Sequence, residues 1–175
     1  MPRIFASLAI GNGLVLVGTA VLGWLRVWPT PERHVLLAVF SLLVSCLVQV
    51  LLVTYFSITG KLVAQAVHLG GLDVKPLMAL NRRKRAVMRR LGVVLASVVL
   101  VTSVGAVHWR YGTWASVHSV AALVVLGVHM LVLFQEYFLV AENAADVERT
   151  MSAYTLRRNA SVQRISIPPE LSQVD

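Results

Sequence analysis

Three histidines fall beside hydrophobic stretches of this chain, at positions where they could bind one ligand together. His34 opens one apolar stretch, His108 closes the next, and His118 lies about one turn into the last. In antiparallel helices, all three rings would lie at similar depth near the external face of a membrane. Imidazole is a common ligand of haem iron, zinc and copper. One hypothesis is therefore a b-type haem or a metal ion bound by these histidines, although no motif selects a ligand pair.

The last apolar stretch also carries ionisable residues within its length. From His118 to His129 is a helical rotation of about 20°, and from His118 to Glu136 about 0°, so the three share one face. Because ionisable groups are costly in contact with lipid, we predict that this face contacts protein. The histidines either pack as neutral, hydrogen-bonded groups or take part in a proton- or quinone-related process. Glu136 is expected to reach the basic layer near Lys61 or Arg90.

The sequence motifs of common enzyme classes are absent. There is no phosphate-binding glycine loop, no His-Glu-x-x-His helix, no nucleophile elbow and no pair of carboxylates within the apolar stretches. The lone cysteine, Cys46, lies inside an apolar stretch, where packing is its expected role. We therefore expect no catalysis from this chain, and at most the role of an electron-transfer subunit.

The elements that must position these residues are hydrophobic helices. Of the 175 residues, 57% are hydrophobic and only 14% are charged, and the mean hydropathy is +0.74. A soluble domain of this size is far less apolar. Stretches at about residues 4–25, 34–59, 91–109 and 114–140 are long enough to cross a bilayer. We predict an all-α, multi-pass integral membrane protein whose residues 1–160 form one antiparallel four-helix bundle.

Two of the predicted spans have faces suited to close helix packing. The second span has small and polar residues that step by three or four and should face the bundle interior: His34, Ala38, Ser41, Ser45 and Gln49. The first span is rich in glycine and has small residues four apart, such as Ser7 and Gly11. Such pairs let a neighbouring helix approach closely. We therefore expect the first helix to pack tightly against the polar faces of the others.

The distribution of charge predicts the orientation. The formal net charge is +8, and the connection at residues 60–90 is strongly basic, with Asp73 as its single acid. By the positive-inside rule this connection and both termini are cytoplasmic, and the short loops at 26–33 and 110–113 are external. A block in this connection could also bind anionic lipid headgroups or an acidic partner: Arg82, Arg83, Lys84, Arg85, Arg89 and Arg90. Because the positive charges lie beside the spans, we do not expect nucleic-acid binding.

Helical periodicity continues outside the spans. In the basic connection it is broken at Gly70 and Gly71, and Pro76 can open a helix that runs through the basic block into the third span. Apolar spacing also predicts a helical extension at residues 141–160. The segment 161–175 has no periodicity and contains two prolines, so a flexible tail is predicted there.

These features favour a structural role in a membrane assembly. Our leading hypothesis is a non-catalytic subunit or anchor of a larger complex in the bacterial inner membrane, with an energy-transducing or electron-transfer assembly as the favoured setting. The partners would be lipids and other membrane-protein subunits, because small external loops leave mainly helix faces and the cytoplasmic surface for contact. The alternatives are a redox protein with a haem or metal at the external histidines, and a small transporter or proton-conducting subunit lined by His118, His129 and Glu136.

Overall fold

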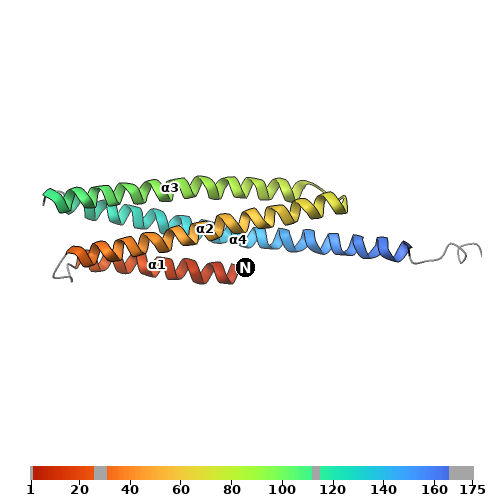
Figure 1. Cartoon of the computed structure of the whole chain (residues 1–175), viewed down its shortest axis with the longest axis horizontal. Coiled ribbons are helices and arrows are strands. Elements are labelled where there is room, and N and C mark those ends of the chain that lie inside the picture. Colours follow the sequence, from red (N-terminus) through yellow and green to blue (C-terminus); the bar gives the residue numbers. More distant parts are fainter. Residues whose placement is uncertain (1, 26–30, 112–114, 166–175) are drawn as a thin grey trace, which may run out of the picture.

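The chain forms four helices, and no other regular structure is present in the residues described. The computed structural model describes the backbone of residues 2–25, 31–111 and 115–165, and the side chains of 2–25, 32–105 and 116–163. The helices are α1 (Pro2–Trp24), α2 (Pro31–Gly70), α3 (Lys75–Tyr111) and α4 (Ala115–Ile165), shown in Figure 1. Each contains a segment long and apolar enough to cross a membrane. The prediction of an all-α chain with four membrane-length helices is therefore confirmed.

Three of the helices are much longer than a bilayer is thick. α2 has 40 residues, α3 has 37 and α4 has 51, whereas α1 has only 23. At 1.5 Å per residue α2 is about 60 Å long, against about 30 Å of hydrocarbon. Figure 1 shows the other three helices continuing past the N-terminal end of α1. We call residues 60–90 and 141–165 the stem. The membrane half is the part that contains α1, together with residues 31–59, 91–111 and 115–140.

The helix bounds differ from the predicted spans at several ends. α2 begins at Pro31, inside the predicted loop 26–33, and α3 continues to Tyr111. α4 continues to Ile165, past the predicted end of the helical extension at residue 160. These differences arise because hydrophobicity locates the part of a helix in lipid, whereas the backbone hydrogen bonds continue into the polar flanks. The rest of both predicted loops and of the tail lies outside the described residues.

α2 ends at a glycine cap inside the stem. Gly71 has a φ of +55°, and the N–H of Leu72 donates to the carbonyl of Val67 at 3.1 Å, which is the bond of a Schellman motif. From α4, Nη1 of Arg157 donates to the carbonyl oxygens of Gly70 at 2.8 Å and Gly71 at 2.7 Å. The predicted break at these two glycines is confirmed, and the side chain of Arg157 joins it to α4.

α3 begins a few residues after this cap. Oδ1 of Asp73 accepts a hydrogen bond from the backbone N–H of Lys75 at 3.0 Å, and this bond is the main reason that the pKa of Asp73 lies below its usual range. Pro76 follows in the first turn, where a missing N–H costs nothing. From there α3 runs without interruption through the basic block into the third span, as the sequence predicts.

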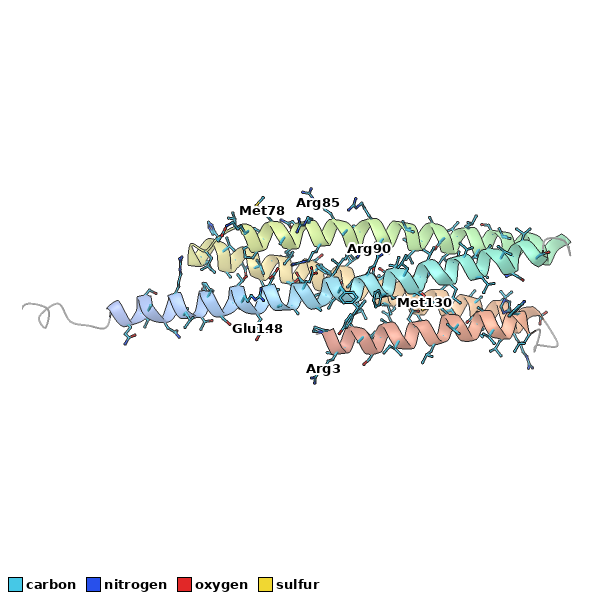
Figure 2. All side chains as sticks on the ribbon, turned by 180° about the vertical axis from the view of Figure 1, so that it is seen from behind. Arg3, Met78, Arg85, Arg90, Met130 and Glu148 are labelled. Atoms are coloured by element: carbon cyan, nitrogen blue, oxygen red, sulfur yellow. The ribbon has the colours of Figure 1, made fainter. Side chains whose placement is uncertain are left out.

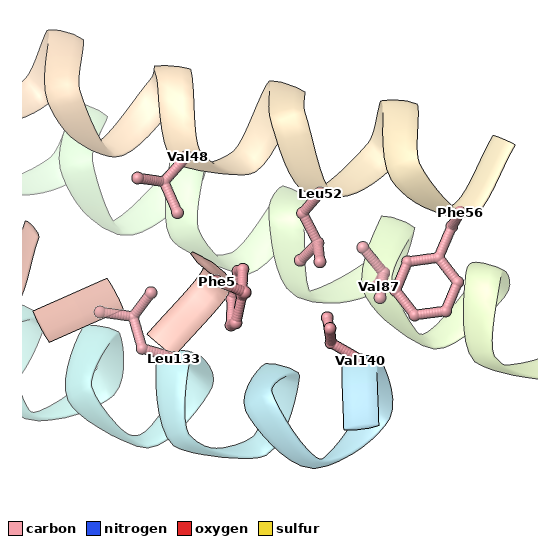
Figure 3. Close-up of a cluster of buried hydrophobic side chains, with 7 residues drawn as sticks. All are labelled: Phe5, Val48, Leu52, Phe56, Val87, Leu133 and Val140. Carbon is pink, nitrogen blue, oxygen red and sulfur yellow. The ribbon is translucent and has the colours of Figure 1, made fainter. Parts of the chain in front are cut away.

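A buried apolar cluster joins all four helices where the membrane half meets the stem. Its members, shown in Figure 3, are Phe5, Val48, Leu52, Phe56, Val87, Leu133 and Val140. A second cluster, of Val63, Val67 and Leu80, lies within the stem. α2 and α4 contact each other and both contact α1 and α3, whereas the described residues of α1 and α3 do not contact each other. The α2–α4 pair is therefore the centre of the fold.

The outer surface of the membrane half is covered by exposed apolar side chains. Leu14 of α1 is 69% exposed, and Leu36 and Leu43 of α2 are 71% and 63% exposed. A surface of this kind is unfavourable in water and suits the hydrocarbon of a bilayer. Length, composition and surface thus all agree with a multi-pass membrane protein.

Candidate functional site

Polar residues on α4 form buried layers that alternate with apolar ones. The polar members are seven residues apart and at most 5% exposed: His129, Glu136, Asn143 and Thr150. Leu133 and Val140 are buried between them. A seven-residue step returns to nearly the same helix face, drifting by only about 20°. Successive polar layers therefore lie about 10 Å apart along one inward seam, which continues from the membrane half into the stem.

In two of these layers, a side chain of α4 is hydrogen-bonded to a side chain of α2. In one, Nε2 of Gln49 donates to Oε2 of Glu136 at 3.0 Å. In the other, Nδ2 of Asn143 donates to Oγ1 of Thr59 at 3.1 Å. Because each of these four side chains is at most 8% exposed, the hydrogen bonds are shielded from water and hold α2 and α4 in one register.

α1 is joined to α2 by similar buried contacts. Oγ of Ser45 donates to Oδ1 of Asn12 at 2.9 Å, and the hydroxyls of Thr19 and Ser41 are 2.5 Å apart. Ser41, Ser45 and Gln49 are each 2% exposed, which confirms the inward face predicted for the second span. Ala38, predicted on that face, is exposed instead. Asn12 was missed, although an asparagine inside a membrane-length helix is itself a signal of an inward polar contact.

The structure places the predicted intramembrane ionisable residues in protein. His129 is 2% and Glu136 is 0% exposed, so the prediction that they face protein is confirmed. His129 uses Nδ1 to contact the carbonyl of Val125 on its own helix at 3.1 Å. Of the two cations expected near Glu136, Lys61 is exposed, whereas the positive charge of Arg90 acts on the carboxyl group. The hydrogen-bond partner of Glu136 is Gln49, because Glu136 lies level with the middle of α2.

Two of the three candidate haem or metal ligands, His34 and His118, have described side chains, and these lie in different surroundings. His34 is half-buried against α1, where a Cβ placed on Gly23 would overlap Cε1 of the ring and lie 3.0 Å from Nε2. His118 is half-buried against α3, where a Cβ on Gly105 would lie 2.9 Å from its Cε1. The side chain of His108 lies outside the described residues. Among the described side chains, no group of three or more His, Cys, Asp or Glu residues could hold a metal ion.

We expect Gly23→Ala to lower the free energy of unfolding by about 1 to 3 kcal/mol, because the new methyl group overlaps the ring of His34. The measurement is reversible unfolding in mixed detergent micelles. Gly18→Ala on the same helix is the control, because a Cβ there has no neighbour within 4 Å. Adding His34→Ala to Gly23→Ala should restore part of the loss. Equal effects at Gly18 and Gly23 would contradict this packing.

The predicted lipid- or partner-binding block divides into outward and inward members. Arg82, Arg85 and Arg89 are exposed, and Figure 2 shows Arg85 pointing away from the helices. Lys84 is partly buried. The inward members are Arg83 and Arg90, discussed below. Only the exposed members are free to meet lipid headgroups or a partner from outside.

Arg83 joins α3 to α4 within the stem. Its Nη1 lies 2.7 Å from Oδ2 of Asp146, and its Nε lies 3.1 Å from Oε2 of Glu142. The side chain of Arg83 is 14% exposed and that of Asp146 25%, whereas Glu142 is 60% exposed. The shielded bond to Asp146 should therefore contribute more to stability than the bond to Glu142.

Arg83→Ala is expected to lower the free energy of unfolding by about 1 to 2 kcal/mol, since it removes this partly shielded pair. Asp146→Asn should also lower the free energy of unfolding, but by less than Arg83→Ala. Chemical unfolding followed by circular dichroism is the measurement, with Arg82→Ala as the control for an exposed arginine of the same helix. If Arg82→Ala destabilised the protein as much as Arg83→Ala, the ion pair would not be the cause.

Comparison with known proteins adds no family to this description. No protein-family model matches the chain, and searches among curated proteins and among solved structures found no match either.

Proposed function

We propose that this chain is a non-catalytic integral membrane subunit, or anchor, of a larger complex in the bacterial inner membrane. It crosses the membrane as an antiparallel four-helix bundle, with both termini and the stem in the cytoplasm. The orientation is supported by the positive-inside rule, because exposed cations such as Lys61, Lys75 and Arg85 gather in the stem. The partners are lipids and other membrane-protein subunits. An energy-transducing or electron-transfer setting remains a prediction.

The main support for this proposal is the structure of the stem. Beyond residue 140, α4 continues for about 38 Å, and α2 and α3 accompany it as a helical pair as far as Arg157, which contacts the end of α2. The stem has its own apolar cluster, the Arg83–Asp146 ion pair, and the contact of Arg157 with the end of α2. A rigid cytoplasmic projection on a lipid-embedded base is what an anchor needs to present a fixed surface to a partner.

The alternation of layers favours a structural role over transport. A proton or ion path along α4 would have to pass from His129 to Glu136 and on to Asn143. Leu133 lies between the first two residues and Val140 between the second two, and both belong to the apolar cluster that joins the four helices. Polar groups about 10 Å apart and separated by packed apolar layers do not form a continuous hydrogen-bonded chain.

The test of this proposal is the size and composition of the native assembly. The protein, extracted from its own membrane in mild detergent, is expected to sediment together with other polypeptides. Changing Arg82, Arg85 and Arg89 together to glutamine should release it from them, whereas changing the same three to lysine should not. A wild-type chain that sediments alone, or only with copies of itself, would overturn the proposal.

Two further measurements on the same material separate the alternatives. In a Cys46→Ser background, a cysteine at Leu156, which is 70% exposed, should react with a membrane-impermeant reagent only from the cytoplasmic side. Oxidised and reduced absorption spectra of the purified chain test the haem hypothesis. A haem spectrum lost on replacing His34 or His118 would favour the redox alternative instead.

A further inference from the structure

Glu136 and Gln49 meet at the centre of the α2–α4 interface, where one side-chain oxygen of each has no hydrogen-bond partner among the described residues. Glu136 is 0% exposed and Gln49 is 2% exposed. Nε2 of Gln49 donates to Oε2 of Glu136 at 3.0 Å, but Oε1 of each residue is buried without a hydrogen-bond partner among the described residues. Two buried acceptors without donors are costly, most of all inside a membrane, where water is scarce.

One proton would satisfy both oxygens. An ionised carboxylate only accepts hydrogen bonds, whereas a neutral carboxylic acid also has an O–H donor. A carboxyl and a carboxamide that already share one N–H···O bond can close a ring through an O–H···O bond between their other oxygens. We propose that Glu136 is a proton-binding site, in which a proton on its Oε1 is donated to Oε1 of Gln49 and ties α4 to α2. The proton comes from water and returns to water, and no other covalent bond changes.

Arg90 of α3 offers the ionised carboxylate a different partner. Its positive charge acts on Glu136, and its Nη1 is buried without a hydrogen-bond partner among the described residues. No ion pair joins the two groups within the described part of the chain. Without the proton, Glu136 would carry a buried negative charge that accepts a single N–H···O bond. The guanidinium of Arg90 would then attract this charge. The protonated site therefore links α4 to α2, and the ionised site favours α3.

The surroundings make Arg90 the charge that competes with proton binding. α2 contributes the uncharged amide of Gln49, and α1 contributes Phe5 to the adjoining apolar cluster. On α4 itself, His129 lies one layer away, about 10 Å along the axis. The carboxyl group thus has a bonded partner in the amide of Gln49 on α2 and feels the positive charge of Arg90 on α3.

Infrared spectroscopy of the whole protein in lipid vesicles tests this directly. At neutral pH we expect the C=O stretching band of a protonated, hydrogen-bonded carboxylic acid, which shifts in deuterated water. The band should disappear in Glu136→Gln and persist in the control Glu148→Gln, an exposed acid on the same helix. Gln49→Leu should move the band to the frequency of a carboxyl without a hydrogen bond.

The wild-type spectrum keeps the test independent of how well the variants fold. Glu136 is the one buried acid among the described side chains, so it is the described group to which a protonated carboxyl band at neutral pH would be assigned. Alkaline buffer should remove the band reversibly. Absence of any such band at neutral pH, with the helical spectrum intact, would mean that Glu136 is ionised and would overturn the proposal. A band that Glu136→Gln leaves unchanged would overturn it as well.

Discussion

Phe56→Ala is expected to lower the free energy of unfolding by about 3 to 5 kcal/mol. Phe56 is 0% exposed and belongs to the cluster in which side chains of all four helices meet. Val87 of α3 and Val140 of α4 belong to the same cluster, and the ring of Phe56 lies edge to face with that of Tyr55, at 5.4 Å between ring centres. Removing it leaves a cavity that the surrounding rigid helices can fill only in part, which adds to the lost burial.

The measurement for Phe56 is reversible unfolding in mixed micelles, followed by circular dichroism. Phe40→Ala is the matched control, because Phe40 lies on the same helix and is 54% exposed. The control should change the unfolding free energy by less than about 0.5 kcal/mol. Comparable losses in the two variants would show that the junction between membrane half and stem is not the centre of stability described here.

Gln49→Leu is expected to lower the free energy of unfolding by about 1 to 3 kcal/mol. The leucine fills a similar space but removes the N–H that Glu136 accepts at 3.0 Å. Because the carboxyl group is 0% exposed, water cannot replace the lost donor without opening the interface. The loss therefore reports the cost of leaving one partner of a buried polar pair unsatisfied.

A second substitution separates this cost from a general effect on packing. Adding Glu136→Leu to Gln49→Leu should recover much of the stability, since an apolar pair of similar volume has no unsatisfied group. Gln65→Leu, an exposed position on the same helix, is the control and should be nearly neutral. If the double variant were less stable than Gln49→Leu alone, the carboxyl group would have another stabilising partner, for which Arg90 is the candidate.

The layered interior relates these two expected outcomes to the proposed function. We expect apolar layers such as that of Phe56 to provide most of the stability, and polar layers such as Gln49–Glu136 to fix the register of α2 against α4 at some cost in stability. A subunit that presents a stem to a partner needs both properties, because a slip of register would displace the stem surface. The polar layers are thus better suited to positioning than to conduction.

Local features of the fold were predictable from the sequence because they depend on local composition. Hydrophobic length located the four helices, and the pair Gly70 and Gly71 located the end of α2, since a glycine readily adopts the positive φ found at Gly71. The inward face of α2 followed from helical spacing, and the burial of His129 and Glu136 followed from spacing together with the cost of ionisable groups in lipid. Hydropathy did not predict how far the helices continue outside the lipid.

The partners of the buried residues required the three-dimensional arrangement. Spacing places Glu136 on an inward face, but the choice of Gln49 over Lys61 depends on the offset between α2 and α4, and the contact of Asn12 with Ser45 depends on how α1 is rotated. Likewise, the predicted similar depth of His34 and His118 does not reveal that one ring packs against Gly23 and the other against Gly105. The amino-acid order determines which face of each helix is polar and where each membrane-length apolar segment lies. Packing between helices determines which polar groups meet, because rotation and offset are set by the shapes of all the contacting side chains together.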